Sequence, residues 1–101
     1  MNGRDGIPFA TREEIIERDG HVCRLCGVYV EIPHIHHVIY RSAGGDGRAD
    51  NLVSLDWQCH AKVHSSKPLW TPILQAVIKT NGVNGIALLR WYEAKERSHV
   101  Q

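Results

Sequence analysis

The stretch of sequence that decides the fold runs from residue 36 to residue 64 and reads HHVIYRSAGGDGRADNLVSLDWQCHAKVH. Residues 28–40 are rich in β-branched and aromatic side chains and are interrupted by Pro33, which predicts two short strands or one bent strand. Residues 42–50 are polar and rich in glycine, as is typical of a long loop. A second strand is expected over 52–55 and a helix over 57–65. The predicted order is therefore strand, loop, strand, helix.

The segments that flank this stretch are predicted to be mainly helical. Thr11 and Glu14 have the spacing of a capping box, so a helix is expected from about residue 12 to residue 18, ended by Asp19-Gly20. Further helices are expected over 72–79 and about 86–96, separated by Asn-Gly breakers at 81–82 and 84–85. Their apolar residues are interpreted as a core face that covers the small central unit, and they are Trp70, Leu74, Val77, Ile78, Ile86, Leu88, Leu89, Trp91 and Tyr92.

Length and composition restrict the class of protein. A chain of 101 residues fits one domain, expected here as a flexible arm (1–10), a core (11–67) and a helical extension of the same domain (68–101). The net charge is only +1, so a nucleic-acid partner must be argued from the site and not from a basic composition. The sequence shows neither an apolar run of membrane-spanning length nor a signal peptide, so we expect a cytoplasmic protein, monomeric or else dimeric.

The three cysteines predict a metal site. Cys23 and Cys26 have the two-residue gap that directs two thiolates at one tetrahedral ion. Cys59 and Asp56, which lies three residues before it, repeat this spacing with an oxygen donor and would complete a structural zinc site. His64 is the alternative fourth ligand. The turn from Cys23 to Gly27 would then be a zinc knuckle, and it is called the knuckle below. A knuckle without metal and a redox pair are the competing interpretations of Cys23 and Cys26.

The histidines predict a second metal site. His60 and His64 are four residues apart in the expected helix, so their rings lie on one face, and Cys59 lies about 100° around that helix from His60. One short helix can therefore serve zinc on one side and another ion on the other. Taken singly, His60 would be interpreted as an ordinary helix residue, and His64 as a charge that complements the dipole at the C-terminus of the helix. His34 shares a strand face with His36 but is interpreted as an ordinary strand histidine.

Residues 23–64 resemble the HNH nuclease family. The matching motifs, in order, are Cys23-x-x-Cys26-Gly27, His36-His37-Val38-Ile39-Tyr40-Arg41-Ser42-x-Gly44-Gly45, Asn51-Leu52-Val53-x-Leu55 and Cys59-His60-x-Lys62. The resemblance implies an α+β fold with a ββα-metal core, a zinc knuckle and flanking helices. Asp56 departs from the family pattern, because many zinc-binding members have cysteine there.

The same resemblance implies roles for single residues. His36 is similar to the family's metal ligand and His60 to a second one, while His64 matches a further ligand in the colicin-like branch of the family. His37 is similar to the general base, and Asn51 to the residue that orients that base or joins the metal. Consecutive strand residues face opposite sides, so His36 and His37 can share a site only at a bulge or a strand end, with His37 toward the water and His36 toward the ion.

The function implied is hydrolysis of DNA phosphodiesters with a divalent cation, Mg²⁺, Mn²⁺, Ni²⁺ or Zn²⁺, leaving 5′-phosphate and 3′-hydroxyl ends. Arg41 and Lys62 are candidate phosphate contacts, because both carry cationic donors. A phage setting beside a packaging terminase is the first expectation for a biological partner. The rivals are a zinc-knuckle DNA-binding module without turnover and a thiol-disulfide protein, which would need a βαβ pattern that this sequence lacks.

Overall fold

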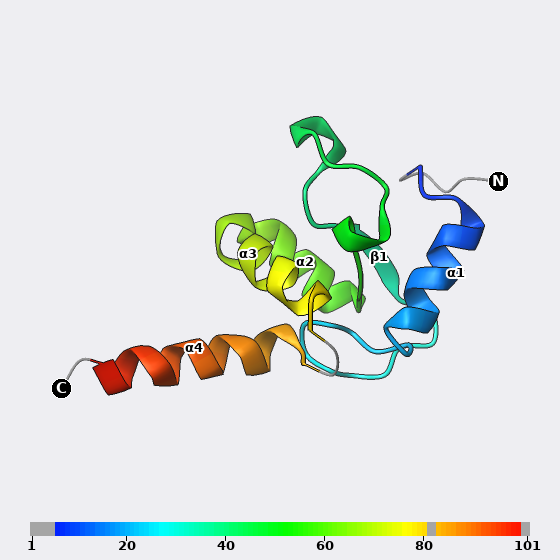
Figure 1. The fold of residues 1–101 in the computed structure, drawn as a ribbon. Coiled ribbons are helices and arrows are strands. Elements are labelled where there is room, and N and C mark those ends of the chain that lie inside the picture. Colours follow the sequence, from blue (N-terminus) through cyan, green and yellow to red (C-terminus); the bar gives the residue numbers. More distant parts are fainter. Residues whose placement is uncertain (1–5, 81–82, 100–101) are drawn as a thin grey trace.

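The computed structural model describes residues 6–80 and 83–99 (Figure 1). Its elements follow in the order α1 (Phe9–Arg18), β1 (His34–His37), a 3₁₀ turn (Arg41–Ala43), a second 3₁₀ turn (Ala49–Asn51), β2 (Leu52–Leu55), α2 (Trp57–Ser65), α3 (Lys67–Ile78) and α4 (Gly85–His99). The predicted bounds of β2 and α2 are confirmed. The predicted strand region 28–40 contributes only β1 to the sheet, together with an isolated bridge between Val22 and Tyr29. The expected Asn81-Gly82 breaker lies outside the described residues.

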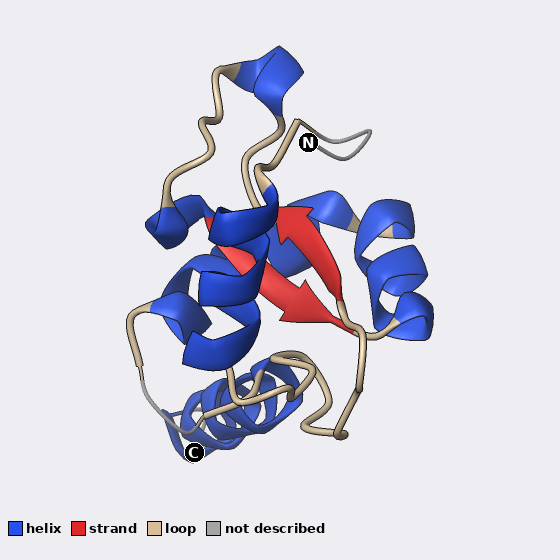
Figure 2. Ribbon diagram, turned by 90° about the vertical axis from the view of Figure 1, so that its right-hand side faces the viewer, coloured by secondary structure: helices blue, strands red, loops and turns tan. Residues whose placement is uncertain are grey.

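The two strands form an antiparallel pair at the centre of the molecule, with helices around it (Figure 2). The register places His36 opposite Val53 and His37 opposite Leu52. All four residues of β2 are buried because both faces of this small sheet are covered by other elements. A two-stranded sheet is marginal by itself, so its stability depends on these helices.

The two faces of the sheet belong to different apolar clusters. On one face, Leu52 and Ile35 pack with Ile15 of α1 and with Ile7. On the other face lies the larger cluster, which joins the knuckle, β2, α2 and α3 through Cys23, Leu25, Val53, Leu55, Cys59, Val63, Trp70, Leu74 and Val77. Because side chains alternate along a strand, His36 shares the face of the larger cluster and His37 shares the face covered by α1.

Two helices begin earlier than predicted. The capping box is wrong, because α1 begins at Phe9 after Pro8 and no side chain caps its first turn. Proline fixes its own φ near the helical value, and the Pro8 carbonyl already accepts the amide of Arg12, so Thr11 lies inside the helix. α3 begins at Lys67 and contains Pro72, where a start at residue 72 was expected. Pro68 sits in the first turn, where its missing N–H costs no hydrogen bond.

The arm expected over residues 1–10 includes packed residues. Ile7 is almost fully buried against the α1 side of the sheet, and residues 9 and 10 already belong to α1. Ile7 therefore contributes to the core, whereas residues 8–10 are exposed.

α4 extends beyond the body of the protein (Figure 1). Its first turns are held by the knuckle, because the Gly85 amide donates to the Arg24 carbonyl and Leu88 and Leu89 pack on the larger cluster. Trp91 and Tyr92 are 54% and 46% exposed, so their assignment to a core face is wrong. The helix leaves the body after Leu89, which carries both rings past the core. Within 6–80 and 83–99, no helix is long and apolar enough to cross a membrane.

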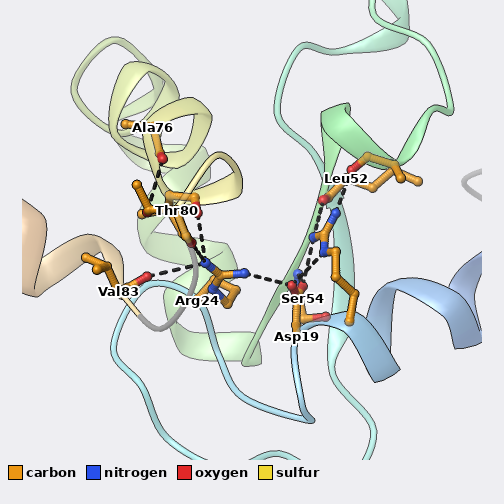
Figure 3. Close-up of polar contacts among 10 residues, drawn as sticks. Asp19, Arg24, Leu52, Ser54, Ala76, Thr80 and Val83 are labelled. Carbon is orange, nitrogen blue, oxygen red and sulfur yellow. Dashed lines mark hydrogen bonds and ion pairs between the residues drawn. The ribbon is translucent and has the colours of Figure 1, made fainter.

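A buried ionic network joins the two halves of the fold (Figure 3). The Asp19 carboxylate accepts hydrogen bonds from Arg18, from Arg24 and from the Ser54 amide of β2. Arg24 also donates to the carbonyls of Val77 and Thr80 at the end of α3, at 2.8 and 2.7 Å. Asp19 therefore connects the end of α1 with β2, and Arg24 connects the knuckle with α3.

We expect Asp19→Asn to lower the free energy of unfolding by about 3–5 kcal/mol, because it leaves the Arg24 guanidinium buried without its anion. Burial alone would raise the pKa of Asp19, but the hydrogen bonds from Arg18 and Ser54 outweigh it and hold this pKa below its ordinary 3.8. A carboxyl with a lowered folded pKa stabilises the fold above its unfolded pKa and loses that effect as the pH falls through the folded value. The difference in melting temperature between wild type and variant should therefore be full at neutral pH and shrink in acid. Equal melting temperatures at pH 7 would contradict this role.

Candidate metal sites and catalytic histidines

Four predicted zinc ligands lie together at the start of α2. The sulfur atoms of Cys23, Cys26 and Cys59 and a carboxylate oxygen of Asp56 lie within 4.8 Å of one another. The knuckle turn is closed by the Gly27 amide, which donates to the Cys23 carbonyl at 2.8 Å, and Gly27 has φ 86°, a value that glycine adopts without strain. Three thiols and one carboxylate around one point indicate a structural metal, and zinc fits this donor set.

The electrostatics of this cluster fit a cation. Burial, and then the neighbouring thiols Cys23 and Cys26, raise the pKa of Cys59 far above its ordinary value. Burial also raises the pKa of Cys26, and its bond to Asp56 adds to this. Several acidic groups packed this closely can ionise together only around a positive charge.

Asp56 has two partners, one for each carboxylate oxygen. Oδ1 accepts the Cys59 amide at 2.6 Å and so caps the N-terminus of α2, while Oδ2 accepts from the Cys26 sulfur at 3.2 Å. Burial alone would raise the pKa of Asp56, but these bonds from Cys59 and Cys26 lower it. Aspartate is among the best N-cap residues and cysteine is not, which gives a physical reason for the departure from the family pattern.

The two roles of Asp56 can be separated by substitution. We expect Asp56→Asn to retain the cap but weaken zinc binding, because the amide carries no charge, and Asp56→Ala to lose both. Asp56→Cys should hold zinc more tightly, with the gain in stability offset by about 0.5–2 kcal/mol for the lost cap. A chelator titration measures zinc retention, and melting curves measure stability. His64→Ala is the control and should retain zinc, since His64 lies in the other cluster. Equal retention in Asp56→Asn, Asp56→Ala and wild type would remove Asp56 from the ligands.

The second cluster consists of three histidines from β1 and α2. Ring nitrogens of His36, His60 and His64 lie within 4.8 Å of one another, and the Nε2 atoms of His60 and His64 are 3.1 Å apart. That separation fits two ligands on one ion, because metal–nitrogen bonds of about 2.0–2.1 Å place neighbouring ligand atoms about 3.0–3.4 Å apart. His36 is only 3% exposed, whereas His64 is exposed, so the cluster opens to solvent on the α2 side.

Burial sets the charge of these rings. It lowers the pKa of His36 to about 3, with further lowering by His60 and His64. It also lowers the pKa of His60 to about 4, with further lowering by His64 and His34. Both rings are therefore neutral at pH 7, and each offers a lone pair to a cation.

His37 lies at the C-terminal end of β1, half-buried and on the opposite face from His36. Asn51 fixes the chain that follows it. The Asn51 side chain accepts the Ile39 amide at 2.8 Å and donates to the carbonyls of Ile39 and Asp46, and its backbone carbonyl accepts the Val38 amide. Both ends of the Asn51 side-chain amide are thus hydrogen-bonded to backbone, and this amide holds the segment that follows His37.

The two predicted phosphate contacts are placed differently. Arg41 begins the first 3₁₀ turn, and its side chain is not among those described. Lys62 is exposed on α2, but it lies two residues after His60, about 200° around the helix and so away from the histidines.

The structure adds three side chains that sequence reasoning left out of the site. His34 Nδ1 lies 2.9 Å from His60 Nδ1, and the Tyr40 hydroxyl lies 2.6 Å from His64 Nδ1. The Lys67 ammonium lies 4.0 Å from the centre of the Tyr40 ring. Strand alternation places His34 and His36 on the same face, so this pattern could have identified His34 as a residue of the site. Nothing local in the sequence links Tyr40 or Lys67 to α2.

Comparison with known families agrees with this geometry. A family model described as HNH endonuclease matches residues 23–66, which contain both clusters. A search of curated proteins finds no match to the chain. The two antiparallel strands are followed by α2, which carries members of both candidate metal clusters, and this is the order of a ββα-metal core. Residues 23–66 therefore belong to the HNH endonuclease family, and the chain is a small α+β protein built around a ββα-metal core.

Proposed function

We propose that this protein is a metal-dependent endonuclease that hydrolyses DNA phosphodiester bonds. The observation that carries the proposal is the solvent-open cluster of His36, His60 and His64 inside the segment that matches the HNH endonuclease model. A bound divalent cation, Mg²⁺, Mn²⁺, Ni²⁺ or Zn²⁺, would neutralise charge on the scissile phosphate and stabilise the leaving oxygen. The three rings would hold it.

His37 is the proposed general base. A histidine with a free ring nitrogen at neutral pH can take a proton from the attacking water. His37 ends β1 on the face opposite His36, so it would reach a water at the histidine cluster around the end of the strand. Asn51 holds the chain just after it through Val38 and Ile39. Asn51 is therefore proposed as a positioning residue for His37.

DNA is the proposed partner. Because the net charge is only +1, we expect individual arginine and lysine side chains, and not a basic surface as a whole, to contact its phosphates. Arg41 remains a proposed phosphate contact, and Lys62, which lies away from the histidines, is proposed to contact a phosphate farther along the DNA. Lys67 joins them, because it contacts Tyr40, contributes to the lowered pKa of His36 and lines a pocket of about 300 Å³ beside the first 3₁₀ turn. A phage packaging terminase is a proposed partner in a cell's cytoplasm, with the nuclease acting as a monomer.

A zinc-knuckle DNA-binding module without turnover is the second candidate. The knuckle and exposed lysines would suit it equally well. Binding alone, however, gives no reason to bury His36 in a neutral state beside two further histidines. The histidine cluster therefore favours the nuclease.

Supercoiled plasmid tests the proposal directly. Zinc-loaded protein should convert it to nicked or linear DNA with at least one of the four cations and not in the absence of added cation. His36→Ala, purified identically, should need much more cation for the same rate, because one ligand is lost, and it also controls for a contaminating nuclease. Absence of cleavage with every cation would favour the binding module.

A further inference from the structure

Both α2 histidines of the cluster have a second side chain beside Nδ1. His60 Nδ1 lies 2.9 Å from His34 Nδ1. His64 Nδ1 lies 2.6 Å from the Tyr40 hydroxyl, which is also 3.3 Å from Nε2 of the same ring and is therefore nearer to Nδ1. The Nε2 atoms of His60 and His64 are 3.1 Å apart, so the contact nearest to each Nδ1 leaves the two Nε2 atoms beside one another.

A neutral imidazole carries one proton, so its position decides which nitrogen can bind a cation. When Nδ1 carries the proton, Nε2 keeps its lone pair. A hydrogen-bond acceptor beside Nδ1 selects this tautomer and fixes the ring plane, as the outer partners of metal-binding histidines generally do. Nδ1 of His34, in the tautomer that carries its proton on Nε2, and the hydroxyl oxygen of Tyr40 can each accept such a bond.

The two supporting side chains are themselves held in place. The Tyr40 ring contacts both the Lys67 ammonium, 4.0 Å from its centre, and the His36 ring, whose centre is 5.9 Å away. The His34 ring meets that of His60 edge-on, with centres 5.1 Å apart. His34 is the first residue of β1, and Tyr40 lies three residues after the end of this strand. Residues 34–40 therefore supply His36 and also one supporting side chain for each α2 histidine.

We propose that His34 and Tyr40 are positioning residues that hold His60 and His64 in the Nδ1–H tautomer and so prepare both Nε2 atoms for the cation. This inference rests on the proposed function only for the presence of the ion.

Two substitutions remove the supports and two others serve as comparisons. Tyr40→Phe deletes only the hydroxyl. Tyr29→Phe deletes the same group from an exposed tyrosine outside the histidine cluster and is therefore the matched control. His34→Ala deletes the acceptor, whereas His34→Asn returns an amide oxygen near the position of Nδ1. Calorimetric titration of zinc-loaded protein with Ni²⁺ should show about 10-fold weaker binding or more for Tyr40→Phe and His34→Ala. Tyr29→Phe should match wild type, and His34→Asn should recover much of the loss.

Nitrogen NMR of the histidine rings in zinc-loaded protein without Ni²⁺ gives a readout independent of cleavage. His60 and His64 should be Nδ1–H tautomers in wild type, and each should become mixed in the variant that lacks its support. Unchanged Ni²⁺ affinity in Tyr40→Phe and His34→Ala, or Nε2–H tautomers in wild type, would overturn the inference while leaving the nuclease intact. If wild type takes up no Ni²⁺ beyond its zinc, this inference falls, whereas plasmid cleavage with Mg²⁺, Mn²⁺ or Zn²⁺ still decides the proposed function.

Discussion

His37→Ala should lower the rate of plasmid cleavage by about 10²–10⁴-fold, the usual cost of losing a general base. His37 lies on the α1 face of the sheet and outside the histidine cluster, so cation affinity, zinc content and melting temperature should stay close to wild type. The measurement is the single-turnover rate of nicking at saturating cation.

The neighbouring residue supplies a matched control for this experiment. His36→Ala removes a proposed ligand one position earlier, so a higher cation concentration should restore part of its activity. The same increase should leave His37→Ala inactive, because the missing group accepts a proton and does not bind the ion. Wild-type rates in His37→Ala, or rescue of His37→Ala by cation, would show that another group is the base.

Cys59→Ser should abolish tight zinc binding and unfold the domain near room temperature. A structural zinc site contributes about 10–16 kcal/mol in zinc-finger peptides at pH 7. This contribution is comparable to the whole free energy of unfolding of a small domain, about 5–15 kcal/mol. Cys59 and Cys23 are also buried in the larger apolar cluster, so this metal would join the knuckle to α2 inside the core.

Elemental analysis and thermal melts followed by circular dichroism measure this effect. Cys23→Ser should behave like Cys59→Ser, and wild type treated with a strong chelator should melt as the variants do. Because His60 follows Cys59 directly, cleavage should disappear together with the fold. Wild type that contains no tightly bound metal, or that melts identically with and without chelator, would contradict a structural zinc.

The sequence by itself determined the order of the core and most members of its two clusters. The bounds of β2 and α2 follow from local patterns, a short apolar run and a helical segment that begins after Asp56. Local pairs within the clusters follow from spacing, since residues three or four apart in or next to a helix meet on one side, as Asp56 with Cys59 and His60 with His64 do. The family motifs could be found for the same reason: each lies within a few residues of chain.

The tertiary structure decided what depends on contacts between distant residues. Whether Asp56 or His64 stands with the cysteines was open in the sequence, and α2 decides it by its orientation, which turns His64 toward His36 and Asp56 toward Cys26. The supports of the histidines join positions 24 or 26 residues apart.

The start of α1 has a local reason, because Pro8 can begin a helix at Phe9 without the side-chain cap that Thr11 offered. The ionic network, in contrast, depends on the tertiary structure. Arg24 reaches the carbonyl of Val77, 53 residues away, a pairing for which the local sequence holds no signal. Local propensity and spacing act over a few residues, whereas burial selects among the remaining alternatives by packing them against the rest of the chain.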